Sequence, residues 1–227
     1  MHTLMVADDH PLFREAIAAV IEAGLPDSRL LEAESLNDAL RHAGACAELD
    51  LVLLDLGLPD ASGLEGLRAL RAAHPWLPVA ILSADQERRT ILDALDLGAV
   101  GYIPKSTPRR DLITALAQLL EGQVYLPSDI MRRPAVPCTS PAGVETPSPG
   151  PRFTELTDKQ LEVLIGLSRG ASNKVIAREL DIAETTVKTH VSAILRKLGV
   201  SGRVQAILAA GEADLAALLA ERQGSSR

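Results

Sequence analysis

The segment LLDLGLPDASGLEGL, residues 53–67, sets an acidic residue directly behind an apolar run and ahead of an amphipathic helix pattern. The run Leu51–Leu54 is short and apolar throughout, which is typical of a strand inside a parallel sheet. Apolar residues then recur at helical spacing over Gly63–Ala73. Asp55 therefore stands at the end of a predicted strand, where a loop leads into a predicted helix.

The same alternation of strand and helix patterns repeats along the first half of the chain. The predicted strands are Thr3–Ala7, Arg29–Ala33, Leu51–Leu54, Val79–Leu82 and Gly101–Ile103. The predicted helices are Pro11–Ala23, Leu36–Ala43, Gly63–Ala73, Glu87–Leu97 and Pro108–Glu121. This alternation predicts an α/β fold, in which a five-stranded parallel sheet carries helices on both faces. In such folds the chemistry gathers at the carboxyl ends of the strands.

Several of these helices carry boundary signals. Ser62 with Glu65 forms a capping-box pattern, and Thr107 stands in the capping position before a proline. Gly24 and Gly122 lie where C-terminal caps belong. We therefore expect helices to begin and end at these residues.

Polar residues follow four of the predicted strands. Asp8 and Asp9 follow the first strand, Asp55 the third, Ser83 the fourth and Lys105 the fifth. Three carboxylates brought together repel one another unless a cation joins them, and Mg²⁺ is the divalent ion that best suits oxygen ligands and retained waters. A lysine and a hydroxyl beside them complete a receptor for a phosphoryl group and its metal. An aspartate in that setting can be the nucleophile, which gives an aspartyl-phosphate.

Four separated stretches agree in order and spacing with a known family. ADDHPLFREAI, LLDLGLPDASGLEGL, ILSA and GYIPKS resemble the receiver domain of two-component response regulators, over about residues 3–122. The resemblance implies a flavodoxin-like fold, with Asp55 as the phosphoacceptor and a histidine kinase as the phosphoryl donor. The other site residues that it implies are the metal-binding acids Asp8 and Asp9, the metal-binding carbonyl of Gly57, the phosphoryl contacts Ser83 and Lys105, and the switch aromatic Tyr102.

Two positions depart from the usual pattern of that family. Gly57 stands where an asparagine is common, so it offers no side chain near the phosphoryl group. Asp85, two residues after Ser83, adds an acid near the site. Both residues bear on the lifetime of the phosphorylated state, but the sequence does not indicate whether they lengthen or shorten it. His10, which follows the acid pair, is expected to be a surface or helix-cap residue.

A change of composition separates the first half from the rest. Residues 127–151, PSDIMRRPAVPCTSPAGVETPSPGP, are crowded with Pro, Ser, Thr and Gly and predict an extended linker. Residues 1–126 carry 10 Lys and Arg against 19 Asp and Glu, whereas residues 152–227 carry 11 against 9. We therefore predict a receiver domain over 1–126 and a second domain over 152–227 with a different kind of partner.

The second domain is predicted to be small and all-helical. Thr157 and Gln160 form a capping box, and Gly170 ends the helix that it opens. Further helices are predicted at Asn173–Leu180, Glu184–Leu198 and Arg203–Ala210. The third of the four has one apolar stripe, made of Val187, Val191, Ile194, Leu195 and Leu198. Its other face is free of acids and suits the major groove of DNA, with Thr185, Lys188, Thr189, Ser192 and Arg196.

The segment LTDKQLEVLIGLSRGASNKVIARELDIAETTVKTHVSAILRKLGVSGRVQAI, residues 156–207, resembles the helix-turn-helix domain of the LuxR/NarL/FixJ group. The resemblance implies double-stranded promoter DNA as a partner and dimerisation through Arg203–Ala210. By the same resemblance Lys188, Thr189 and Ser192 face bases. The implied phosphate contacts or flanking supports are Lys174, Thr186, His190 and Lys197.

Two features of this domain are expected to lower its affinity for DNA. Ala183 replaces the usual Ser or Thr cap of the recognition helix, which typically costs about 1 kcal/mol. Ser192 replaces a common basic residue, so dimerisation becomes more necessary. The Ala/Leu-rich stretch 212–222 either lengthens the dimer interface or packs on its own domain.

The bulk composition excludes several other classes. Aromatic residues are only 2% of the chain, which argues against a single-stranded nucleic acid binder. Cys46 and Cys138 form neither a disulfide framework nor a metal-ligand cluster. We expect neither a signal peptide nor a membrane span, and hence a cytoplasmic protein.

These features predict a transcription regulator rather than an enzyme. In the unphosphorylated protein the receiver is expected to pack on the second domain and to hide the recognition helix. Phosphorylation of Asp55 is expected to release the second domain, which then dimerises and binds promoter DNA, with RNA polymerase as a further candidate partner. An aspartyl-phosphate phosphatase is one alternative, but such enzymes usually carry an aspartate where this chain has Gly57. The other alternative is a receiver that acts by protein contact independently of phosphorylation.

Overall fold

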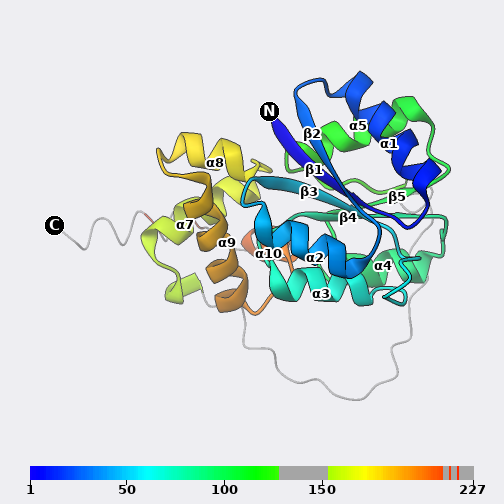
Figure 1. Cartoon of the computed structure of the whole chain (residues 1–227). Coiled ribbons are helices and arrows are strands. Elements are labelled where there is room, and N and C mark those ends of the chain that lie inside the picture. Colours follow the sequence, from blue (N-terminus) through cyan, green and yellow to red (C-terminus); the bar gives the residue numbers. More distant parts are fainter. Residues whose placement is uncertain (128–152, 212–214, 216–218, 220–227) are drawn as a thin grey trace, which may run out of the picture.

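A computed structural model gives the structure of the chain over residues 1–127 and 153–211, and at Leu215 and Leu219. Cys138 and the predicted linker, except its first residue, lie outside the described residues. Figure 1 shows two units side by side, an α/β unit drawn from blue to green and a helical unit drawn from yellow to orange. Within the described ranges, no helix is both long and apolar enough to span a lipid bilayer.

The α/β unit is built on a parallel sheet, as the sequence predicts. Its strand order is β2-β1-β3-β4-β5, so the chain reverses its direction across the sheet between β1 and β3. The strands are β1 (His2–Ala7), β2 (Ser28–Ala33), β3 (Leu49–Leu54), β4 (Val79–Ser83) and β5 (Gly101–Pro104). All five predicted strands are confirmed, with small shifts at their ends. The short apolar runs are buried because helices cover both faces of the sheet.

The helices divide between the two faces. They are α1 (Pro11–Gly24), α2 (Leu36–Ala45), α3 (Glu65–Ala73), α4 (Arg88–Asp96) and α5 (Arg109–Leu120). Alternate strand residues point to opposite faces, so Met5 and Ala7 join one core while Leu4 and Val6 join the other. The first core is closed by α2, α3 and α4, and the second by α1 and α5.

Several predicted helix boundaries need correction. Glu65 accepts a hydrogen bond from the Ser62 backbone N–H at 3.0 Å, but α3 takes Leu64 as its N-cap, so only half of the predicted capping box forms. The N-cap residue of α5 is Pro108, not Thr107. Gly122 does follow α5 with φ +93°, in the left-handed conformation of a C-terminal cap.

Gly24 has a different role from the predicted cap. It is the last residue of α1, and a Cβ there would lie 2.7 Å from the side chain of Ile113 on α5. The absence of a side chain lets α1 and α5 pack closely, and the sequence alone does not show this neighbour.

The helical unit contains η1 (Phe153–Glu155), α7 (Asp158–Ser168), α8 (Asn173–Glu179), α9 (Glu184–Leu198) and α10 (Arg203–Gly211). Both hydrogen bonds of the capping box between Thr157 and Gln160 are present. The apolar stripe of α9 is buried among α7, α8 and α10, as predicted. Asp181, with φ +52°, makes the turn between α8 and α9.

The chain beyond α10 touches the same core at two positions. Leu215 is 5% exposed within the core of the helical unit, and Leu219 packs against that core. Of the two alternatives for the stretch 212–222, these contacts favour packing on its own domain. Leu218, which the same pattern includes, lies outside the described residues.

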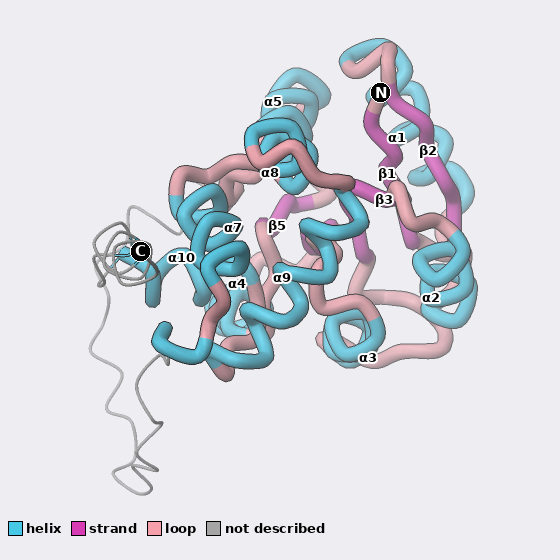
Figure 2. Tube along the Cα trace, turned by 90° about the vertical axis from the view of Figure 1, so that its left-hand side faces the viewer, coloured by secondary structure: helices cyan, strands magenta, loops and turns pink. Residues whose placement is uncertain are grey.

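The helical unit docks on the edge of the sheet where the strands begin (Figure 2). Lys174 of α8 donates to the Met1 carbonyl just before β1, at 2.6 Å. Arg71 of α3 donates to the Ser201 carbonyl at 2.7 Å, and Gln205 of α10 donates to Leu95 of α4 at 2.5 Å. The two units therefore meet mainly through long polar side chains that donate to backbone carbonyls.

Two glycines bring the backbones of the units into direct contact. A Cβ on Gly202 would lie 2.6 Å from the Gly98 Cα, and a Cβ on Gly98 would lie 2.7 Å from the Ser201 carbonyl oxygen. Real Cβ atoms do not approach other atoms so closely, so this contact requires glycine on both sides. Trp76 packs against the apolar cores of both units.

Candidate functional site

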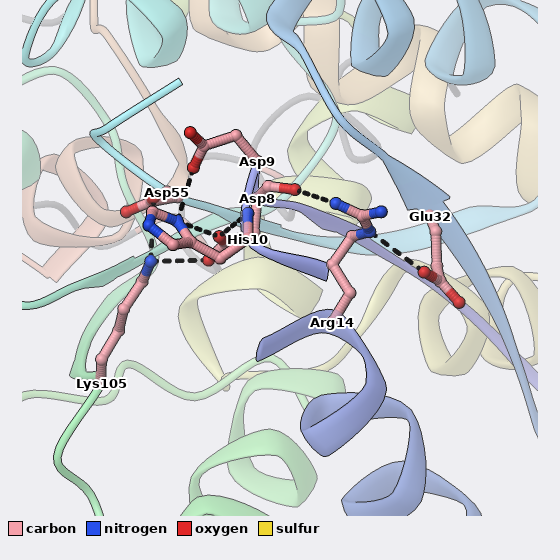
Figure 3. Close-up of polar contacts among 7 residues, drawn as sticks. All are labelled: Asp8, Asp9, His10, Arg14, Glu32, Asp55 and Lys105. Atoms are coloured by element: carbon pink, nitrogen blue, oxygen red, sulfur yellow. Dashed lines mark hydrogen bonds and ion pairs between the residues drawn. The ribbon is translucent and has the colours of Figure 1, made fainter. Parts of the chain in front are cut away.

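The predicted acidic site forms at the carboxyl ends of the strands (Figure 3). The sheet ladder continues into the site, because the Asp55 N–H donates to the Ala7 carbonyl at 2.9 Å. Asp8 is fully buried and Asp55 is 6% exposed. The Lys105 Nζ lies 2.7 Å from Asp8 Oδ2 and 2.9 Å from Asp55 Oδ2. Side chains that follow three different strands thus meet at one point.

Lys105 is the charge that holds these two acids together. Burial opposes the charged form of its amine, but hydrogen bonds to Asp8 and Asp55 and the attraction of their charges outweigh burial. The pKa of Lys105 therefore lies above its ordinary value. Phe13 supports the same amine, with its ring centroid 4.7 Å from Nζ. The lysine is positioned to meet negative charge that develops on Asp55.

Arg14 is a supporting residue that the sequence did not indicate. Its Nη1 donates to the Asp8 backbone carbonyl at 2.8 Å. Its other nitrogens pair with Glu32 at 3.2 Å and Glu34 at 2.6 Å, of which Glu32 is drawn in Figure 3. The side chain is 8% exposed and links β2 to the end of β1. It fixes the backbone from which Asp8 projects.

Ser83 is the last residue of β4, and Tyr102 lies in β5, as expected. The Ser83 hydroxyl accepts a hydrogen bond from the Asp85 N–H at 3.1 Å. The Tyr102 hydroxyl donates to the Asp85 carbonyl at 2.8 Å, and its ring is fully buried. Burial raises the pKa of this phenol, so it remains a hydrogen-bond donor at neutral pH. Tyr102 is therefore tied to the loop that follows β4.

Gly57 and Asp85, the two departures from the family pattern, lie close to the groups of the acidic site and of the loop after β4. A Cβ on Gly57 would lie 3.2 Å from Asp55 Oδ2, so a side chain there would stand against the Asp55 carboxylate. The Asp85 carboxylate accepts from the Glu87 N–H at 2.8 Å, so it is used at the start of α4. Gly57 leaves space beside Asp55, while Asp85 organises the neighbouring loop.

The donor set fits a divalent cation. Asp8, Asp9, His10 and Asp55 each offer one ligand atom, and these atoms lie within 4.8 Å of one another. Three of the four ligands are carboxylates, which Mg²⁺ prefers. His10 was expected to be a surface or cap residue. It is exposed and occupies the N-cap position of α1, but its imidazole contacts Asp8 and Asp9 rather than capping the helix.

The predicted DNA-reading face of α9 is partly covered by the α/β unit. Lys188 is 5% exposed, and its Nζ lies 2.5 Å from the Ala47 carbonyl and 3.4 Å from the Leu49 carbonyl. The same nitrogen lies 4.5 Å from the ring centroid of Trp76 and 3.0 Å from Glu184. In this arrangement Lys188 is not available to DNA.

The other predicted DNA contacts differ in their exposure and in their hydrogen-bond partners. Thr185, Thr186, Thr189 and Arg196 are exposed, while His190 and Ser192 are half-buried. The hydroxyls of Thr189 and Ser192 donate to carbonyls of their own helix. Lys197 donates within its own unit, to the Glu155 carbonyl and the Gln160 side chain, each at 2.8 Å. Lys174 is held at the docking edge.

Comparisons with known proteins place both units in families. Residues 4–117 match the response regulator receiver domain family, and residues 154–210 match the luxR family of bacterial regulatory proteins. The chain belongs to the response regulators of the NarL type. The glycerol metabolism activator of Pseudomonas putida is 50% identical over 224 residues, which is 96% of this chain and 99% of that protein.

More distant relatives of this response regulator are response regulators as well. The nitrate/nitrite response regulator protein NarL of Escherichia coli is 31% identical, over 90% of this chain and 92% of its own length. A crystal structure of a LuxR-family two-component response regulator from Aurantimonas matches with a TM-score of 0.53 and 31% identity, over 57% of this chain and 91% of that one. The protein is a DNA-binding transcriptional response regulator, and its receiver domain implies a kinase partner.

Proposed function

We propose that Asp55 accepts a phosphoryl group from a histidine kinase, and that this event controls the access of α9 to promoter DNA. The observation that carries the proposal is the burial of Lys188. The lysine expected to read DNA is 5% exposed and bound to carbonyls of the receiver unit. The protein would be a regulator rather than an enzyme, since its family consists of transcriptional regulators.

The chemical step is supported by the geometry around Asp55. An Asp55 oxygen forms a bond to phosphorus as the bond from phosphorus to the kinase imidazole breaks, and the imidazole leaves with its electron pair and is then protonated. Asp8, Asp9, Asp55 and the Gly57 carbonyl would hold Mg²⁺, which supplies neutralisation of the phosphoryl oxygens. Lys105 is already 2.9 Å from Asp55 and can follow the new negative charge, while Ser83 offers a hydroxyl.

Phosphorylation then acts on the docking of the two units. The phosphoryl group carries about −1.5 to −2 charges. Because the Asp55 carboxylate loses its own negative charge in the new bond, the site beside Asp8 gains at most about one negative charge. Lys105, Ser83 and Tyr102 rearrange around the phosphoryl group, and Tyr102 is tied to the loop before α4. The end of α4 touches the helical unit through the Leu95 carbonyl. A shift of α4 would weaken that contact and release α9.

The released domain, residues 152–227, would bind double-stranded DNA as a homodimer. Lys188, Thr189 and Ser192 would face bases, with Thr185 and Arg196 on the same face. Lys174, Thr186, His190 and Lys197 would contact phosphates or support the helix. Dimerisation through α10 would require its release, because Gln205 now donates to the receiver unit. The receiver would span 1–126, the linker 127–151, and the site of action would be the cytoplasm, with RNA polymerase as a candidate partner.

The name of a relative supports a proposal for the direction of regulation. A protein that is half identical over nearly the whole chain is named a glycerol metabolism activator. The present protein would likewise activate transcription of genes for the use of glycerol. Transcripts from a strain that carries Asp55→Asn should fail to rise on glycerol, while growth on other carbon sources leaves them equal to wild type.

The central test uses the full chain with a small phosphodonor and Mg²⁺. The wild type should gain one phosphoryl group by mass and bind its promoter more tightly, and Asp55→Asn should do neither. Equal phosphoryl gain by both proteins would show that the acceptor is wrong. Continuous release of phosphate from small phosphoesters would instead favour the phosphatase, and DNA binding unaffected by phosphorylation would favour a receiver acting by protein contact.

A further inference from the structure

His10 is turned toward the acids of the phosphorylation site. Its Nδ1 lies 2.6 Å from Asp9 Oδ1 and 3.2 Å from Asp8 Oδ1 (Figure 3). The side chain is 68% exposed, so burial does not force the ring into this orientation. The imidazole therefore faces the same acids that would hold the divalent cation.

The backbone helps to place the ring there. Pro11 begins α1, and His10 is its N-cap residue in an extended conformation, with φ −89° and ψ 107°. The His10 N–H donates to Asp8 Oδ1 at 2.9 Å. This tight turn leaves the imidazole and the Asp8 carboxylate on the same side of the chain.

Asp8 uses its two oxygens for two different neighbours. Oδ2 faces Lys105 at 2.7 Å, whereas Oδ1 faces His10. A cation bound at Oδ1 would thus leave the Lys105 contact in place. The histidine and the lysine do not compete for one oxygen.

The distances suit ligands of a single octahedral ion. With bonds of about 2.1 Å, neighbouring ligand atoms lie about 3.0 Å apart and opposite ones about 4.2 Å apart. The separation of 3.2 Å between His10 Nδ1 and Asp8 Oδ1 matches a neighbouring pair. The 2.6 Å between His10 Nδ1 and Asp9 Oδ1 is a hydrogen-bonding distance, and it would have to open to about 3.0 Å when the ion binds. The ligand atoms of Asp8, Asp9, His10 and Asp55 all fall within 4.8 Å of one another, so small shifts would enclose one ion.

We propose that His10 is an additional ligand of this metal site, and that the site consequently favours first-row transition ions such as Mn²⁺ and Co²⁺ over Mg²⁺ more strongly than the acids alone would. Imidazole nitrogen suits transition metals, whereas Mg²⁺ is held by oxygen and water. The inference rests on the proposed function only in using Asp8, Asp9 and Asp55 as metal ligands.

The test measures metal binding directly on the full chain. Mg²⁺ and Co²⁺ are titrated into wild type, His10→Ala and the control His42→Ala, which removes a histidine that pairs with Asp38 on α2. His10→Ala should weaken Co²⁺ binding by about 10- to 100-fold, the range typical of losing a group that supports a metal. It should weaken Mg²⁺ binding much less than Co²⁺ binding, and His42→Ala should change neither affinity.

Pulsed electron paramagnetic resonance of bound Mn²⁺ supplies a second readout. The wild type should show coupling to an imidazole nitrogen, and His10→Ala should lose it. Metal binding without nitrogen coupling, or equal losses for Co²⁺ and Mg²⁺, would overturn the role of His10 while leaving the acid site intact. If wild type binds no metal at all, both the inference and the acid site of the proposed function fail.

Discussion

The two edges of the sheet use different chemistry. At the carboxyl edge the contacts join charged side chains, with Lys105 between Asp8 and Asp55. At the amino edge long side chains donate to backbone carbonyls, as Lys188 does to Ala47. The first edge is suited to bind charge, and the second holds a neighbouring domain mainly through backbone carbonyls, with the Trp76 ring as a further partner of Lys188.

The same strands serve both edges. Leu49 at the start of β3 offers its carbonyl to Lys188, and Asp55 follows the end of that strand. Met1 precedes β1 and accepts from Lys174, while Asp8 follows the same strand. Each of these strands therefore has a docking group at one end and a site group at the other.

The largest expected effect is the loss of phosphorylation, which tests whether the phosphoacceptor lies at the carboxyl edge of the sheet. Asp55→Asn removes the nucleophile, so phosphoryl gain by mass spectrometry should be abolished. DNA binding by the unphosphorylated protein should stay at the wild-type level, because the docking edge is untouched. A phosphorylated Asp55→Asn protein would place the acceptor elsewhere.

Lys188 tests whether one residue serves both docking and DNA reading. Lys188→Ala should cost the phosphorylated protein about 1–3 kcal/mol of DNA-binding free energy, as loss of a base contact does. Gel retardation at fixed salt measures this loss. Arg178→Ala, an exposed change on α8, is the control. If Lys188→Ala binds promoter DNA as tightly as wild type, α9 does not read DNA through this residue.

A substitution at Gly202 should separate the two units at the docking edge. It changes no residue of the acidic site or of the predicted DNA-reading face of α9. A Cβ there would lie 2.6 Å from the Gly98 Cα, and overpacking of this kind typically costs about 1–3 kcal/mol. Gly202→Ala should raise DNA binding by the unphosphorylated protein several-fold in the same gel assay. Gly211→Ala, where a Cβ meets nothing within 4 Å, should leave it unchanged. Unaltered basal binding by Gly202→Ala would mean that docking does not restrain α9.

The smallest expected effect concerns the charge balance of the carboxyl edge. Lys105→Met leaves Asp8 and Asp55 without their cation and should lower the free energy of unfolding by about 1 kcal/mol in the absence of metal. Urea denaturation measures the loss, and Mg²⁺ should restore more stability to the variant than to wild type. Because the folded pKa of Lys105 is raised, its contribution is complete below the ordinary lysine pKa and is lost only as pH rises through the folded value. The difference should therefore be constant near neutral pH.

The sequence predicted one edge of the sheet far better than the other. Asp8, Asp55, Ser83 and Lys105 could be found because each side chain follows an apolar run, and parallel strands bring such positions together. Arg14 was missed because its partners on β2 become neighbours only once the strand order is known.

The covering of the recognition helix was expected from the sequence, but the residues of the docking edge could not be predicted, because backbone carbonyls have no signature in sequence. The burial of Lys188 depends on how two separate units meet, and no periodicity within α9 reports this. The same holds for the contact of Gly98 with Gly202, since either glycine alone is typical of an ordinary loop. The sequence located side chains that directly follow strands of one domain, but it located neither Arg14 nor the contact between the two backbones.

Trp76 gives the docked arrangement an optical signature. It is the single tryptophan of the chain, it packs against both apolar cores, and the Lys188 ammonium lies over its ring. Separation of the units would replace a cation and apolar neighbours with water, and indole emission responds in intensity and wavelength to such a change. If phosphorylation of Asp55 separates the units as proposed, native fluorescence should follow that event in real time, without a dye or an added label.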